Sequence, residues 1–156
     1  MTKTILITGA TDGIGLLTAK NLASEGHTIL LHGRSTAKLE AAAKEVGGTT
    51  QSYSADLSRM ADVTAMADAI RKDHRQLDVV INNAGVLKIK DTMTADGFDA
   101  RFMVNTFAPY VLTRALLPII PRDVLSQHVM FEHPTQRRKA RLRKTSPFTF
   151  SHSKVT

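Results

Sequence analysis

Three glycines near the start of the chain have the spacing of a loop that can bind a phosphate. Gly9, Gly13 and Gly15 follow a short apolar run at residues 5–7. The next segment, residues 16–24, has the apolar spacing of a helix. Glycine allows a tight turn and lets a phosphate approach the bare backbone, and a helix N-terminus directs N–H groups at that anion. The order of strand, glycine turn and helix therefore predicts a phosphate-binding loop; an ordinary strand-to-helix turn is the alternative.

Polar residues also follow three later segments of the chain that we expect to be strands. Arg34, Asp56 and the run Asn-Asn-Ala-Gly at residues 82–85 each stand at the end of such a segment, the one before Asp56 being the weakest of the three. In an open parallel sheet, ligands bind beyond the carboxyl ends of the strands. We therefore expect these residues and the glycine turn to gather at one edge of a sheet.

Arg34 indicates which dinucleotide would bind. It lies 19 positions after Gly15, where an NAD-binding unit carries an acidic residue for the ribose 2′-hydroxyl. The planar fork of an arginine instead suits a 2′-phosphate. The sequence therefore favours NADP(H) over NAD(H), with an exposed arginine at the start of a helix as the alternative.

Alternating strands and helices must position these residues. We expect strands over residues 5–7, 28–32, 51–55 and 77–81. We expect helices over residues 16–24, from a cap at Ser35 to residue 46, and from a cap at Ser58 to about residue 72. A last, long helix is expected from residue 98 to about residue 119, with a kink at Pro109. Such alternation implies βαβ units and a parallel sheet. The predicted fold class is therefore α/β, a Rossmann-type doubly wound parallel sheet, which we expect to be incomplete at its C-terminal side.

Composition limits the class of protein. The chain has 156 residues and no cysteine, so it forms no disulfide or thiolate metal site, and we expect no metal site of another kind. It contains no apolar run near the roughly 20 residues that cross a bilayer, and we expect no signal peptide. We therefore expect one cytoplasmic domain without a membrane partner.

The charge is divided unevenly along the chain. Residues 1–120 hold 13 Lys/Arg and 12 Asp/Glu, whereas residues 121–156 hold 8 and 2. Most of the net charge of +7 therefore lies in the last segment. The sequence predicts a domain over residues 1–120 and a basic, atypical segment over residues 121–156.

The strand-end motifs resemble those of the short-chain dehydrogenase/reductase family. The family has the same Gly-x-x-x-Gly-x-Gly spacing after a threonine, here Thr8, and the same Asn-Asn-Ala-Gly run. Asn105, in Val-Asn-Thr, stands at the position of its active-site asparagine. The surrounding words Asp-Gly-Phe and Leu-Leu-Pro are similar to those of retinol and protochlorophyllide reductases. The resemblance covers roughly residues 3–120 and implies an NADP(H)-binding Rossmann domain.

The resemblance implies roles for individual residues. Asp56 would accept a hydrogen bond from the adenine amino group with Leu57 behind it, unless it is only a turn carboxylate beside a helix start. Asn105 would hold a water in a proton relay, unless it simply faces solvent. The cofactor-binding residues implied are Thr8, Gly9, Thr11, Asp12, Gly13, Ile14, Gly15, Arg34, Asp56, Leu57, Asn83, Ala84, Gly85 and Lys154.

The family's catalytic residues match this chain incompletely. The family uses a serine and a Tyr-x-x-x-Lys motif, in which the lysine lowers the pKa of the tyrosine that donates a proton. The best match here is residues 150–154, with Lys154 in the lysine position but Phe150 in the tyrosine position. Ser126 is the better serine candidate and Ser146 the other. The catalytic residues implied are Asn105, Lys154 and Ser126.

Two functions follow from this resemblance. One is an NADP(H)-dependent oxidoreductase that moves hydride between nicotinamide and a small carbonyl or alcohol substrate, with a homodimer formed through the long helix. The other is a catalytically inactive, truncated homologue that binds only nucleotide or a partner. We expect the basic segment to be a solvated tail. The alternatives are that it is an out-of-frame product or an arm that binds an acidic partner. A nucleic-acid partner is disfavoured, because aromatic residues are not interleaved with the basic residues.

Overall fold

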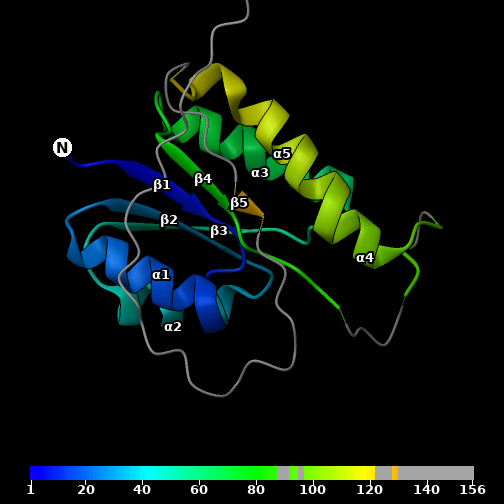
Figure 1. Cartoon of the computed structure of the whole chain (residues 1–156), viewed down its shortest axis with the longest axis horizontal. Helices are drawn as coiled ribbons and strands as arrows, with labels where there is room; N and C mark the ends of the chain where they lie inside the picture. The colour runs from blue at the N-terminus through cyan, green and yellow to red at the C-terminus, as the bar shows by residue number, and fades with distance from the viewer. Residues whose placement is uncertain (88–91, 95–96, 122–127, 130–156) are drawn as a thin grey trace, which may run out of the picture.

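A parallel sheet with helices on both faces organises the computed structural model, which describes residues 1–87, 92–94, 97–121 and 128–129 (Figure 1). The strands are β1 (Thr4–Ile7), β2 (Thr28–Gly33), β3 (Thr50–Ser54), β4 (Val79–Asn82) and β5 (His128–Val129). Their order is β3-β2-β1-β4-β5, and every pairing is parallel. This confirms the predicted doubly wound α/β fold, in which the strand order reverses beside β1.

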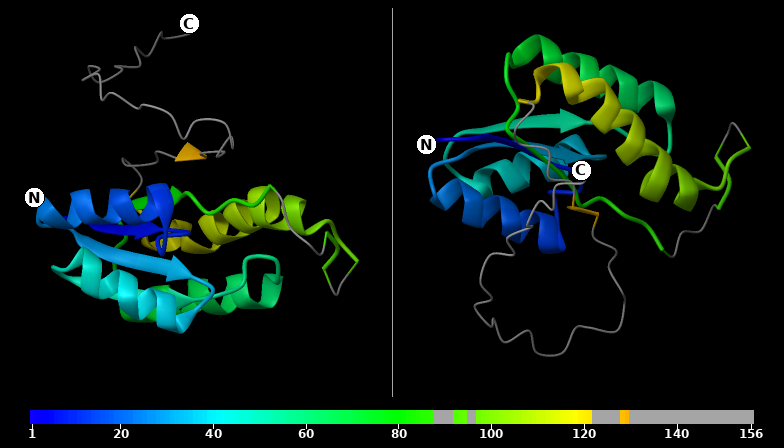
Figure 2. Two further views of the ribbon diagram at one scale, coloured as in Figure 1. Left: turned by 90° about the horizontal axis from the view of Figure 1, so that it is seen from below. Right: turned by 45° about the horizontal axis from the view of Figure 1, so that its top comes forward.

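Successive residues of the strands face opposite sides of the sheet, and each side has its own core. Ile5, Ile7 and Ile29 pack on one side with residues of α1 (Gly13–Ser24) and α2 (Thr36–Val46). The two helices lie side by side over that side in the left view of Figure 2. Because both faces are covered, β1 and β2 are apolar along most of their length rather than alternating, whereas the edge strand β3 (Thr-Gln-Ser-Tyr-Ser) is mostly polar.

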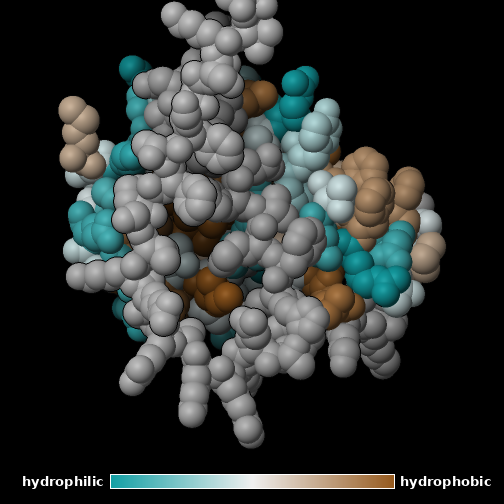
Figure 3. Space-filling model, in the orientation of Figure 1, coloured by the Kyte–Doolittle hydropathy of each residue, from teal (hydrophilic) through white to brown (hydrophobic). Residues whose placement is uncertain are grey.

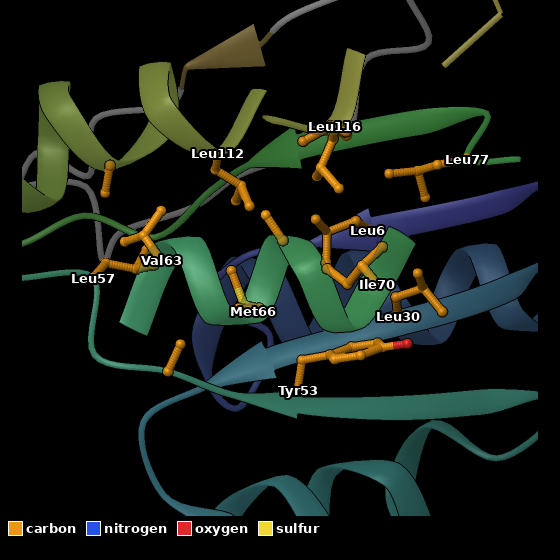
Figure 4. Close-up of a cluster of buried hydrophobic side chains, with 14 of the residues drawn as sticks. Leu6, Leu30, Tyr53, Leu57, Val63, Met66, Ile70, Leu77, Leu112 and Leu116 are labelled. Carbon is orange, nitrogen blue, oxygen red and sulfur yellow. The ribbon is translucent and has the colours of Figure 1, made fainter. Parts of the chain in front are cut away.

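The second core lies under α3 (Met60–Asp73) and α5 (Ala108–Leu116), which lie side by side in the right view of Figure 2. Figure 4 shows Leu6, Leu30 and Tyr53 of the sheet directed at side chains of these helices. The Tyr53 hydroxyl donates to the Asp73 carboxylate at 3.0 Å. Burying one leucine side chain stabilises a fold by about 1.5–3 kcal/mol. Because many apolar side chains are buried on each side of the sheet, the two cores hold the strands, and with them the strand ends, in fixed positions.

Side-chain caps begin the first two helices, α1 and α2. Asp12 accepts from Gly13 N at 2.7 Å, so α1 begins three residues earlier than expected. Ser35 caps α2 as predicted, since its hydroxyl accepts from Lys38 N at 3.4 Å. The cap predicted at Ser58 is wrong: α3 begins at Met60, and Ser58 Oγ donates to Asp56 Oδ1 at 2.8 Å instead.

The long helix is interrupted rather than uniform. It consists of α4 (Ala100–Phe102), the π segment η1 (Met103–Phe107), α5 and the 3-10 turn η2 (Leu117–Ile119). It begins at Ala100 rather than at residue 98 because Asp99 caps it. Pro109 has no N–H for an α-helical bond, and the chain widens into the π segment immediately before it.

Exposed apolar side chains gather near the start of this helix. Phe102 and Phe107 are about half exposed and pack edge to face, with ring centres 5.0 Å apart. Phe98 and Tyr110 are also exposed. Figure 3 shows apolar surface on the side of the molecule where α4 lies. Within the ranges that the structure describes, none of the helices has the length and apolar character needed to cross a membrane.

Candidate functional site

Two glycines of the loop between β1 and α1 stand where a side chain would not fit. Gly9 has a φ of 66°, and a Cβ there would lie 2.9 Å from Ala84 Cα. A Cβ on Gly15 would overlap the carbonyl oxygen of Gly9 and lie 2.5 Å from Asn83 Nδ2. The two glycines therefore let the loop pack directly against Ala84 and Asn83 at the N-terminus of α1; its binding of a phosphate stays a prediction.

The turn after β4 braces this loop from the side. Asn83 Nδ2 donates to Thr8 O at 2.9 Å and to Gly9 O at 3.1 Å. Ala84 N donates to the buried Thr8 hydroxyl at 3.0 Å. The two motifs that the sequence picked out are 74 to 76 residues apart along the chain, and the structure brings them into direct contact.

Arg34 stands beside the same loop. It directly follows Gly33, the last residue of β2, and a Cβ on Gly33 would lie 2.5 Å from Thr11 Cγ2. Thr11 therefore packs over the end of β2. The Arg34 side chain is exposed, and its guanidinium makes no ion pair with any acidic residue in the described ranges. Such a guanidinium can pair with an incoming phosphate.

Asp56 organises the turn between β3 and α3. Its Oδ1 atom accepts from Ser58 N at 2.9 Å and from Ser58 Oγ at 2.8 Å. Leu57 is buried in the core under α3 and α5. Of the two roles that the sequence left open, the contacts of Oδ1 match the turn carboxylate; the role toward adenine stays a prediction.

Asn105 lies in the π segment and clamps the chain after β4. Its Oδ1 accepts from Val86 N at 2.8 Å, and its Nδ2 donates to Val86 O at 2.8 Å. The alternative of a solvent-facing side chain is therefore wrong. Both polar atoms of the Asn105 side chain are bonded to the backbone of Val86. The backbone carbonyl of Asn105 receives no α-helical hydrogen bond, because the residue four positions later is Pro109, which has no N–H.

His32 is a residue of this site that sequence reasoning missed. It lies in β2 and is 2% exposed. Its Nδ1 accepts from Gly9 N at 3.2 Å, and its Nε2 lies 3.1 Å from Ala55 O. Burial lowers the pKa of His32 below its ordinary value of 6.5. The available signal was a histidine inside an otherwise apolar run, which indicates a buried polar contact.

Several predicted residues lie outside the described part of the chain. These are Ser126, Ser146, Phe150 and Lys154, together with nearly all of the basic segment. The site that the structure describes is therefore the nucleotide side of the prediction. It contains Thr8 to Gly15, Arg34, Asp56, Leu57, Asn83 to Gly85 and Asn105.

Comparisons with known proteins agree with this geometry. The family model described as short chain dehydrogenase matches residues 3–125. Retinol dehydrogenase 13 of Homo sapiens is 38% identical over 120 residues, which are 74% of this chain and 36% of that protein.

Solved structures are similar over the same part of the chain. A metagenomic short-chain oxidoreductase in complex with NADP has a TM-score of 0.66 and 36% identity, over 75% of this chain and 56% of that one. A short-chain dehydrogenase from Sphingobium yanoikuyae in complex with NADPH has a TM-score of 0.64 and 35% identity, over 74% and 47%. The chain thus spans less than two thirds of the length of each of these relatives.

Proposed function

This chain belongs to the short-chain dehydrogenase family. We propose that it binds NADP(H) at the glycine loop and acts as an oxidoreductase on a carbonyl or alcohol. The observation that carries the proposal is the contact between the loop and the turn after β4, where Asn83 and Ala84 hold Thr8 and Gly9. Gly9 and Gly15 leave no room for a Cβ because the loop packs against Ala84 and Asn83, and the N-terminus of the helix that follows the loop fits an anion bound through backbone N–H groups.

The N-terminus of α1 supplies donors for the phosphates of the cofactor. The first N–H groups of a helix have no partner within it. Asp12 takes up the N–H of Gly13, so we propose that the N–H groups of Ile14 and Gly15 bind the phosphates. The Asp12 carboxylate lies beside this position and opposes the binding of an anion.

Arg34 supports a preference for the phosphorylated dinucleotide. Its exposed guanidinium follows the end of β2, where Thr11 of the glycine loop packs against Gly33. A planar guanidinium binds a 2′-phosphate in a bidentate manner, whereas it gains little from a 2′-hydroxyl. Solved relatives that contain NADP and NADPH also favour this cofactor.

A thermal-shift titration with NADPH and NADH tests the binding proposal. A ligand at about 100 times its dissociation constant stabilises a fold by roughly 2.7 kcal/mol. We expect a rise in Tm with NADPH, a smaller rise with NADH, and loss of the difference in Arg34→Ala. Arg75→Ala, at an exposed arginine between α3 and β4, is the matched control and should behave as wild type. No shift with either nucleotide would refute the proposal.

The catalytic part of the proposal concerns proton transfer. The nicotinamide, when bound, supplies or accepts the hydride. We propose that Ser126 and Lys154 orient the substrate oxygen and the cofactor. Because Val86 occupies the side chain of Asn105, the backbone carbonyl of Asn105 is the atom that would hold a water.

A second candidate function is nucleotide binding without turnover. It is favoured by Phe150, which has no proton to donate where the family has its tyrosine. Losing a general acid costs about 10² to 10⁴ in rate. Assaying wild type and Phe150→Tyr on a panel of carbonyl compounds separates the two functions. A higher rate in Phe150→Tyr than in an inactive wild type supports binding without turnover through loss of the general acid, whereas activity in wild type supports the oxidoreductase. A homodimer and a cytoplasmic location stay predictions.

A further inference from the structure

His32 connects three parts of the sheet edge beneath the glycine loop. It is one of three buried polar residues among those the structure describes, the others being Thr8 and Asn82. Gly9 N donates to its Nδ1 at 3.2 Å, and its Nε2 lies 3.1 Å from Ala55 O. One imidazole ring thus joins the loop after β1, the end of β2 and the segment after β3.

These contacts define the protonation state of the ring. Gly9 N–H is a donor, so Nδ1 must offer a lone pair. Ala55 O is an acceptor, so Nε2 must carry the hydrogen. Only the neutral Nε2–H tautomer satisfies both partners, whereas a protonated ring would direct an N–H at the N–H of Gly9.

We propose that His32 is a positioning residue for the cofactor, whose neutral ring holds Gly9 and thereby the phosphate-binding loop. This inference rests on the proposed binding of NADP(H) at that loop. Cofactor affinity should then fall when the ring is protonated, because the hydrogen bond to Gly9 is lost while the fold remains. The ring acts through Gly9 and does not itself contact the cofactor.

The charged groups around His32 act in opposite directions. Asp56, in the segment after β3, raises its pKa, whereas Arg34, after β2, lowers it; burial has the largest effect and lowers the pKa. On α3, Asp62 Oδ2 accepts from Asp56 N at 3.3 Å. In the glycine loop the only charged residue is Asp12, which caps α1. The net effect is a pKa lower than that of an ordinary histidine, which favours the neutral ring.

Three substitutions separate the two hydrogen bonds of the ring. His32→Asn places an amide oxygen near the position of Nδ1 and keeps an acceptor for Gly9. His32→Gln places an amide nitrogen near the position of Nε2 and keeps only the donor to Ala55. His32→Leu keeps neither. If the loop contact matters, cofactor affinity follows the acceptor: Asn close to wild type, Gln and Leu weaker by about three- to tenfold, the value of one hydrogen bond.

Calorimetric titration of the full chain with NADP⁺ from pH 5 to pH 7.5 is the test. The 2′-phosphate itself titrates near pH 6, so the informative quantity is the difference between wild type and His32→Asn. We expect wild type to lose additional affinity on acidification, because the amide of asparagine does not protonate. Melting curves without ligand verify that each variant is folded; if His32→Leu is unfolded, Asn against Gln provides the comparison.

The outcomes distinguish this inference from the proposed function. If wild type binds no NADP⁺, the proposed function fails and the inference fails with it. If wild type binds and the Gln variant binds as tightly as Asn, or the pH profiles of wild type and Asn coincide, the inference is overturned and the proposed function stands. Rescue by Asn, together with a loss of affinity on acidification that is larger in wild type than in that variant, supports it.

Discussion

Replacing Gly15 by alanine tests the packing of the glycine loop. The added Cβ would overlap the carbonyl oxygen of Gly9 and lie 2.5 Å from Asn83 Nδ2. The backbone of the loop must move to relieve the first overlap, and Asn83 must also move and lose its bonds to Thr8 O and Gly9 O. Both responses disturb the position at which we propose that phosphate binds.

The expected change in stability follows from three opposing effects. Alanine is better than glycine inside a helix by about 0.8–1.0 kcal/mol. Against this, overpacking costs about 1–3 kcal/mol, and the two hydrogen bonds of Asn83 are worth about 0.5–1.5 kcal/mol each. We expect the free energy of unfolding of Gly15→Ala to fall by roughly 1 to 5 kcal/mol.

Urea denaturation followed by circular dichroism measures this change. Gly85→Ala is the matched control, because a Cβ on Gly85 would meet Asn105 Oδ1 at an ordinary 3.6 Å. At such a position, alanine leaves stability unchanged or raises it by about 0.4–1 kcal/mol. If Gly15→Ala unfolds at the same urea concentration as wild type or a higher one, the contact between the loop and the turn after β4 is not as described.

Two further predictions concern single residues of the site. Asp12→Asn keeps a good helix cap and removes a negative charge beside the proposed phosphate site. NADP⁺ should therefore bind about two- to fivefold more tightly at low salt, and this gain should shrink at high salt. Calorimetry at two salt concentrations measures both effects, and an affinity equal to that of wild type would contradict the prediction. Asn105→Ala removes both bonds to Val86 and should lower the free energy of unfolding by about 1–3 kcal/mol. Asn21→Ala, at an exposed position of α1, is the control and should leave the free energy of unfolding unchanged. Equal urea midpoints for the two variants would argue against the contact between Asn105 and Val86.

The sequence could predict features that depend on local patterns. Apolar runs located β1, β2 and β4, whereas β3 has a weaker and mostly polar signal. The cap at Ser35 followed from a serine placed before a helical pattern. Ser58 had the same local pattern but failed as a cap, because the carboxylate of Asp56 two residues earlier takes its hydroxyl. The two-residue β5 is too short to give a periodic signal.

Contacts between distant residues could not be predicted in the same way. The motifs identified the glycine loop and the Asn-Asn-Ala-Gly turn, but not that Asn83 donates to Thr8 O and Gly9 O. His32 is 23 residues from both of its partners, and its role depends on strand neighbours rather than on its own segment. Periodicity describes one element at a time, so a polar side chain shared by three elements escapes it.

The strand order has a consequence for how the protein is made on the ribosome. β1 is synthesised first, yet Ile5 pairs with Val79 of β4, and the loop after β1 is held by Asn83 and Ala84. Until those residues emerge, the nascent chain has an open β1 edge, a site for unwanted strand pairing. NADP(H) cannot assist folding during this interval, because the loop that would bind it is completed only by the later segment. A cellular chaperone that covers the β1 edge would therefore act before the cofactor does.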